Sequence, residues 1–219
     1  MHELFRLEET VPMAPGTSPF HVRGVYYARV VTFARSLPGG IEQFLGGLLD
    51  PRVRDFMRQQ FHFMNWYDAF PMLPCGVAMA RICQQPFEEF MRERARASML
   101  ILVPSMFRVF ARLGGPRLAA SHAPRLFQSH FDFVELTLPR VNDVSGSGTV
   151  TGVPLYLAPI IANQVLGIIS GALESLGASA IDASYRDVST ASPRYGFDTV
   201  TFHGDFAWSL AQRAVRRGA

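Results

Sequence analysis

The chain has 219 residues, a length that suits one domain with a large core. An apolar content of 48% and 18 phenylalanines exclude a disordered protein. All 21 basic residues are arginines, they are interleaved with acids, and the net charge is only +3. The sequence therefore lacks the basic stripe that nucleic-acid binding requires, and we expect no nucleic-acid partner.

The cysteines and the N-terminus indicate the cellular setting. Cys75 and Cys83 are the only cysteines, and their separation within one predicted helix is too large for a disulfide. The first residues are charged and lack the apolar stretch of a secretory signal. We therefore expect a reduced, cytoplasmic protein. We divide the chain into a flexible leader over residues 1–19, a single domain over 20–208 and a tail over 209–219.

The N-terminal half is predicted to be helical. Asp50 and Pro51 suit the N-cap and first position of a helix, and Gly and Pro residues separate the apolar-periodic segments. Trp66 and Tyr67 interrupt the pattern. The predicted helices cover residues 20–36, 41–49, 51–63, 75–83, 87–103 and 104–113.

The C-terminal half alternates between apolar and polar residues, which is typical of strands. We expect a turn over residues 142–148, which are rich in Asn, Gly and Ser, and a polar loop over 189–193. The predicted strands cover residues 130–138, 149–153, 179–186 and 197–203. The fold class is therefore α+β, with a helical half packed on a small antiparallel sheet in the order β-β-α-β-β.

The stretch over residues 155–176 is predicted to be the long helix of that order, with one apolar stripe on the sheet. Its other face is small and polar. Gly167 and Gly171 on that face would let another backbone approach closely, either in a homodimer or within the chain. The stretch is also nearly long and apolar enough for a membrane span, but its polar residues and the lack of flanking basic clusters argue against one.

Most catalytic signatures are absent, so we expect no enzyme: the sequence has no nucleophile elbow, Walker loop or dinucleotide fingerprint. The run from Ser145 to Gly148 resembles part of a phosphate loop, but its place between two strands favours a hairpin loop. No histidines pair at helical spacing, so no helical metal site is expected. His62 could serve as an axial haem ligand if it lay in an apolar pocket.

An aromatic group around Trp66 is the candidate site. It either packs in the core or forms the wall of an apolar pocket between the helices and the sheet. We expect the pocket to bind a small hydrophobic ligand of unknown identity, with Tyr67 or Arg108 as the polar contact. The candidate ligand-binding residues are Phe63, Trp66, Tyr67, Phe70, Phe107, Arg108 and Phe133.

Three short motifs and the order of elements carry a family resemblance: Arg23-Gly24-Val25-Tyr26-Tyr27, Trp66-Tyr67 and Val103-Pro104-Ser105. Over residues 20–205 the chain resembles a myxobacterial family of paralogous proteins of unknown function. That family is similar to the vinyl-reductase-like, haem-NO-binding and TRAPP-subunit fold group. The resemblance implies cytoplasmic sensing or scaffolding, often as dimers with hydrophobic ligands, and it implies no catalytic residues. The Tyr-x-Ser-x-Arg haem signature is missing, and the nearest run is Ser184-Tyr185-Arg186-Asp187.

Three hypotheses follow. The first is a sensory or regulatory module that binds a small apolar or amphipathic ligand between helices and sheet and signals through a homodimer or a partner surface. The second is a ligand-free protein–protein scaffold of the TRAPP type. The third is a haem-binding gas sensor.

Overall fold

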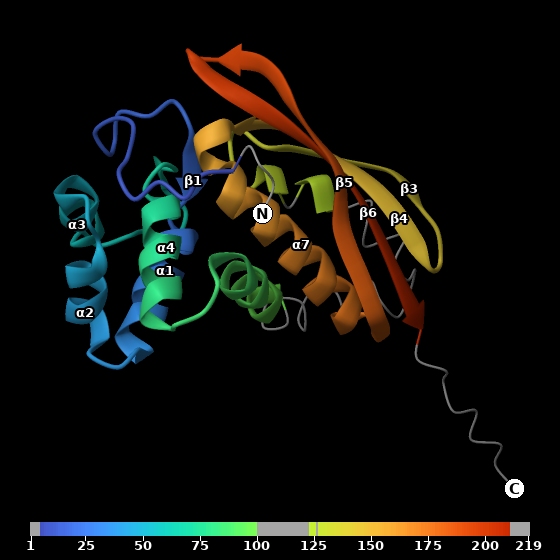
Figure 1. The fold of residues 1–219 in the computed structure, drawn as a ribbon, viewed down its shortest axis with the longest axis horizontal. Coiled ribbons are helices and arrows are strands. Elements are labelled where there is room, and N and C mark those ends of the chain that lie inside the picture. Colours follow the sequence, from blue (N-terminus) through green and yellow to red (C-terminus); the bar gives the residue numbers. More distant parts are fainter. Residues whose placement is uncertain (1–4, 100–122, 126, 211–219) are drawn as a thin grey trace, which may run out of the picture.

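The computed structural model describes residues 5–99, 123–125 and 127–210, and it has a helical side and a sheet side (Figure 1). A further helix covers residues 87–99, and we call it helix 87–99. The predicted helix over 104–113 lies outside the described residues. The labelled helices are α1 (Val25–Ser36), α2 (Gly40–Gly47), α3 (Pro51–Met57), α4 (Met72–Ile82) and α7 (Ala158–Ser175).

A four-stranded antiparallel sheet forms the other side, in the spatial order β3-β4-β6-β5. Two strands come before α7 and two after it, so the predicted β-β-α-β-β order is confirmed. The strands are β3 (Glu135–Val141), β4 (Ser145–Pro154), β5 (Ala178–Arg194) and β6 (Phe197–Leu210). The β5–β6 hairpin is long, and its tip reaches over the helical side near β1 (Figure 1).

The predicted turn over residues 142–148 is wrong in its extent. Asn142 Oδ1 accepts hydrogen bonds from the backbone N–H groups of Val144 and Ser145, at 2.8 and 2.7 Å, and β4 begins at Ser145. Gly146 and Gly148 occupy positions in β4 where neighbouring side chains leave no room for a Cβ atom. A Cβ on Gly146 would lie 2.4 Å from the Phe206 ring. The run from Ser145 to Gly148 is therefore neither a hairpin loop nor a phosphate loop.

The polar loop predicted over residues 189–193 is also wrong, because β5 continues to Arg194. Backbone pairing with β6 extends along this stretch, and Thr199 Oγ1 donates to the Ser192 carbonyl at 2.8 Å. Arg194 Nη1 donates to the Phe133 carbonyl at 3.1 Å, which ties the end of the hairpin to the segment before β3. A strand held by its partner strand and by these bonds does not need alternating apolar residues.

The strand predicted over 130–138 begins later, at Glu135, with only an isolated bridge between Phe131 and Val22 before it. At the other end of the chain, β1 (His21–Arg23) pairs with β2 (Trp66–Asp68) in a two-stranded sheet. The helix predicted from residue 20 therefore begins at Val25.

The third helix ends at Met57 rather than residue 63. Its predicted N-cap is confirmed, because the Asp50 side chain accepts a hydrogen bond from the Arg52 backbone N–H.

The long helix α7 is confirmed, with a 3₁₀ turn (η1, Leu155–Leu157) before it. On its sheet side, Tyr185 Oη donates to the Ala162 carbonyl at 2.7 Å. Its small face is buried as well, because helix 87–99 covers it. A Cβ on Gly167 would lie 2.3 Å from the Arg92 carbonyl oxygen, and one on Gly171 would lie 2.6 Å from that of Arg96. The two glycines therefore serve a contact within the chain.

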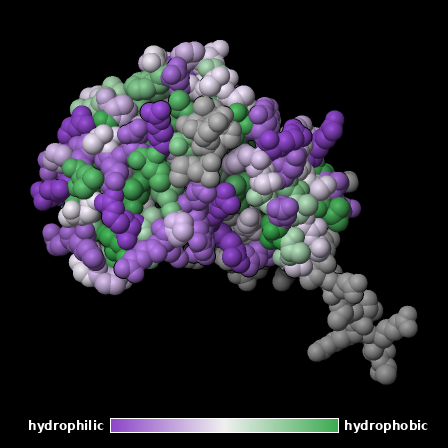
Figure 2. All heavy atoms as spheres, viewed as in Figure 1, coloured by the Kyte–Doolittle hydropathy of each residue, from purple (hydrophilic) through white to green (hydrophobic). Residues whose placement is uncertain are grey.

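The segment Leu155–Ser175 is the one helix among the described residues that is long and apolar enough to cross a membrane. About 67% of its most apolar window is buried inside the protein, as in the core helix of a soluble domain. The face shown in Figure 2 is mostly polar, with its apolar side chains in small separate patches. Cys75 and Cys83 are both free, as expected.

Candidate ligand-binding cavity

The described residues of the predicted aromatic pocket do not line one common cavity. Phe63 and Trp66 have exposed fractions of 63% and 39%, so they lie at the surface. Phe70 and Phe133 are buried, and both pack edge-on against Phe20, with ring centroids 5.8 and 5.5 Å apart. These two residues belong to the core, because Phe20 fills the space between them. Phe107 and Arg108 lie outside the described residues.

Tyr67 and Trp66 stabilise the loop around His62 instead. The backbone N–H of His62 donates to Tyr67 Oη at 3.0 Å, and the Arg23 guanidinium stacks 3.9 Å from the centre of the Trp66 ring. A Cβ on Gly24 would lie 2.2 Å from the His62 carbonyl oxygen, so only glycine fits there. His62 itself is exposed, and the haem-ligand hypothesis for it is wrong because it does not lie in an apolar pocket.

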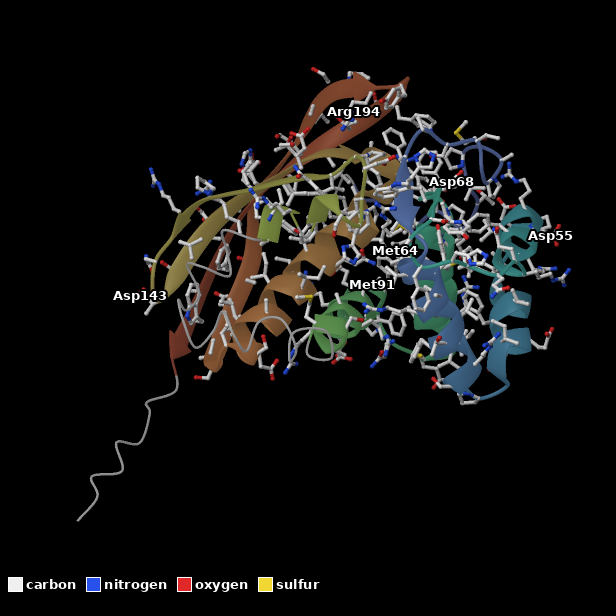
Figure 3. All side chains as sticks on the ribbon, turned by 180° about the vertical axis from the view of Figure 1, so that it is seen from behind. Asp55, Met64, Asp68, Met91, Asp143 and Arg194 are labelled. Carbon is white, nitrogen blue, oxygen red and sulfur yellow. The ribbon has the colours of Figure 1, made fainter. Side chains whose placement is uncertain are left out.

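A cavity of about 160 Å³ lies elsewhere, where α1, helix 87–99 and α7 meet. Figure 3 labels Met91, which lies on helix 87–99 and lines it. Most of its walls are apolar side chains, a composition typical of small-molecule sites. It is lined by Val22, Val25, Tyr26, Arg29, Val30, Phe33, Met79, Phe90, Met91, Arg94, Ala95, Ser98, Met99, Phe127, His130, Phe131, Gln164 and Ile168.

Two helical stripes face each other across this cavity. The α1 stripe runs from Val25 to Phe33, and the stripe of helix 87–99 runs from Phe90 to Met99; in both, the lining residues recur at intervals of one and three. That spacing places each set on one side of its helix. The cavity remains because helix 87–99 packs differently on its two sides. The glycine face of α7 holds this helix close, whereas α1 packs against helix 87–99 with bulky side chains.

Tyr26 and Gln164 supply neutral polar groups to the wall. Burial raises the pKa of the Tyr26 hydroxyl well above its usual value. Tyr26 therefore stays neutral at physiological pH and can donate or accept a hydrogen bond. This pair gives the cavity a neutral polar group among apolar walls.

Two arginines line the same cavity. Burial lowers the pKa of both Arg29 and Arg94, because a charged guanidinium loses hydration there. Both groups remain charged at neutral pH, since the pKa of an arginine in water is above 12. The Arg94 guanidinium carbon lies 3.7 Å from the centre of the Phe33 ring, which is a cation–π contact. The cavity therefore combines an apolar body with fixed positive charge.

The sequence predicted a helix over residues 20–36 but no site on it. The signal that could have found the cavity is a charged residue inside each apolar stripe, Arg29 in one and Arg94 in the other. A core position rarely carries an arginine unless the charge is paired or functional.

The arrangement of elements can be compared with solved structures. A mutant of T. tengcongensis H-NOX has a TM-score of 0.60 at 10% identity, over 87% of this chain and 99% of that chain. An oxygen-binding H-NOX domain related to soluble guanylate cyclases has a TM-score of 0.58 at 12% identity, over 85% of this chain and 95% of that one. The fold is that of H-NOX domains. No protein-family model and no curated protein sequence matches the chain.

Another solved structure with this fold concerns haem distortion in the H-NOX family. It has a TM-score of 0.56 at 10% identity, over 85% of this chain and 92% of that one. The fold therefore implies haem as a cofactor to be tested against the cavity. The cavity formed by the described residues does not fit it. Pockets for drug-sized ligands take roughly 300–1,000 Å³, and haem is a large ligand, whereas this cavity has about 160 Å³. Among the described histidines, His130 is the one that lines the cavity. Within the described part of the chain, no group of three potential metal ligands lies together.

Proposed function

We propose that this protein is a non-enzymatic sensory module of the cytoplasm whose three-helix cavity binds a small apolar or amphipathic molecule. The observation that carries the proposal is the cavity itself. It is apolar on most of its walls and has a few placed polar groups, among them Tyr26 and Gln164. A sensory role agrees with the H-NOX fold, which houses oxygen-binding domains in other proteins.

The size of the cavity limits the ligand. An engineered cavity of about 150 Å³ with apolar walls binds benzene in another protein, and this one has about 160 Å³. The ligand we propose is therefore a single ring with one small substituent, or a short chain of similar volume. The deformable side chains of Met79, Met91 and Met99 in the wall would adapt to either shape.

Helix 87–99 offers a route from the cavity to the sheet. Residues on one side of it line the cavity, and residues on another side contact α7. Arg92 Nε donates to Asn163 Oδ1 at 2.8 Å, and Arg96 donates to both carboxylate oxygens of Glu174, at 2.6 and 2.9 Å. A ligand that binds one position of this helix more tightly than another would shift α7 and the sheet with it.

The signal would pass to a homodimer or a partner protein through the sheet side. Gly167 and Gly171 are not the contact for that dimer, because helix 87–99 covers them. The dimer hypothesis is tested by light scattering across protein concentrations with and without ligand.

Calorimetric titration with benzyl alcohol tests the proposed function. We expect saturable binding at one site, and we expect Val30→Trp, which puts an indole into the cavity, to abolish it. Met91→Trp fills the cavity from the opposite wall and serves as an independent variant. If the wild-type protein does not bind benzyl alcohol, or if both folded variants bind it as the wild type does, the cavity is not the site.

The other two hypotheses predict different results. A ligand-free scaffold of the TRAPP type has a filled core, and the cavity argues against it. A haem sensor would show a Soret band after incubation with haem, and the size of the cavity argues against that result.

A further inference from the structure

The arginines of this chain differ in how their charge is compensated. Most described arginines bond to a carboxylate, an amide or a backbone carbonyl, as Arg52 does with Asp50 and Arg96 with Glu174. Arg29 and Arg94 make no hydrogen bond or ion pair in the described part of the chain. Other arginines without a polar partner, such as Arg35, are exposed to water, whereas Arg29 and Arg94 are half-buried.

Among the described residues, no carboxylate pairs with either of these two cations. No Asp or Glu is among the described residues that line the cavity. The sequence of residues 100–122, outside the described ranges, also contains no acidic residue. A half-buried cation without an anion loses hydration with no compensating charge, so such an arrangement is typical of a site that receives its anion from a ligand.

Both arginines line the same cavity as Phe33. Arg29 and Phe33 are four residues apart on α1, so they are neighbours on one helical face. Arg94 approaches Phe33 from helix 87–99 and stacks on it, 3.7 Å from the ring centre. Stacking uses the flat face of the guanidinium and leaves its N–H groups at the edge, where they can bind a planar anion.

We propose that the ligand is a compact organic carboxylate, whose apolar body lies between the two helical stripes and whose carboxylate is bound by Arg29 and Arg94. This inference depends on the proposed function, because it names the class of ligand for the same cavity. Charge-assisted hydrogen bonds from guanidinium groups would fix the head of the ligand. Tyr26 and Gln164 supply the neutral polar contact nearby.

Three probes of nearly equal shape test the head group at neutral pH: benzoate, benzamide and benzylammonium. We expect benzoate to bind roughly tenfold or more tightly than benzamide, as charge-assisted hydrogen bonds imply. Benzylammonium should bind most weakly, because two cations repel it. Calorimetric titration of the full chain gives the three dissociation constants directly.

Matched variants locate the effect. Arg29→Gln and Arg94→Gln should weaken benzoate binding more than they weaken benzamide binding, so that the preference for benzoate is lost. Arg94→Lys should restore part of the preference because it keeps the charge. Arg58→Gln is the control, since Arg58 lies exposed at the end of α3 and pairs with Asp55. Circular dichroism confirms that each variant is folded.

The outcomes separate the two proposals. If benzamide binds as tightly as benzoate, or if Arg58→Gln lowers benzoate affinity as much as Arg29→Gln and Arg94→Gln do, the carboxylate inference is overturned and the ligand-binding cavity stands. If none of the probes binds to the wild-type protein, the proposed function fails and the inference fails with it.

Discussion

Replacing Gly167 by alanine tests the close contact between α7 and helix 87–99. The new Cβ would lie 2.3 Å from the Arg92 carbonyl oxygen and 2.8 Å from the Ala95 Cβ, about 1 Å short of ordinary van der Waals contact with the oxygen. The helices would have to separate by about that amount, and overpacking of this kind costs about 1–3 kcal/mol. The hydrogen bond from Arg92 to Asn163 would lengthen with the separation.

Helix propensity acts in the opposite direction, because alanine is favoured over glycine in a helix by about 1 kcal/mol. We expect a net destabilisation of up to about 2 kcal/mol, which lowers the melting temperature by up to about 8 °C for a chain of this length. Urea unfolding followed by circular dichroism measures the free energy of unfolding, provided that the transition is two-state.

Gly46→Ala is the matched control. Gly46 lies in α2, and a Cβ there would meet no atom within 4 Å. The same substitution should therefore stabilise the protein, by about 0.5–1 kcal/mol. If Gly167→Ala stabilised the protein as Gly46→Ala does, the two helices would not be in contact and the walls of the cavity would be misplaced.

Three further predictions concern the rest of the chain. Hydrogen bonds from Arg52 lower the pKa of Asp50 to about 2, below its unfolded value, so the charge of Asp50 stabilises the fold above about pH 4 and less as the pH falls towards 2. Asp50→Asn should cost about 2 kcal/mol at pH 7 and nearly nothing at pH 2, as urea titrations at both values would show. Trp66→Ala should leave benzyl alcohol affinity unchanged, because Trp66 does not line the cavity; weaker binding would contradict this. Tyr27→Phe removes a buried hydrogen bond to the Asp68 carbonyl and should cost about 1 kcal/mol in thermal unfolding.

The sequence predicted α7 and the element order because periodicity is a local signal. The apolar spacing over residues 155–176 identified a helix, and the change of period after residue 130 identified strands. Strand ends were predicted less well, since β5 and β6 are held by backbone pairing along stretches where side chains do not alternate. Gly146 looked like a turn residue, yet it is required by the Phe206 ring that packs on it.

The site could not be located from aromatic density. Phe70, Phe133 and Trp66 are all large aromatic residues, yet the first two are in the core and Trp66 is at the surface. The two phenylalanines are buried because both pack against Phe20, a contact between distant parts of the chain. The small residues Gly167 and Gly171 predicted a close backbone contact, either in a homodimer or within the chain. The sequence alone does not separate these two explanations. Arg29 and Arg94 each interrupt an apolar stripe in the sequence, but only the structure shows that the two helices that carry them face each other.

Methyl NMR of protein labelled at methionine methyl groups tests the position of the ligand most directly. Met79, Met91 and Met99 line the cavity, whereas Met72 is buried elsewhere in the core and Met64 is exposed. Upon titration with benzoate, we expect the three cavity methyl signals to shift together along one saturation curve while Met72 and Met64 stay in place. A shift confined to Met64, or no shift of the cavity methyls at saturating benzoate, would contradict a ligand-binding cavity between α1, helix 87–99 and α7.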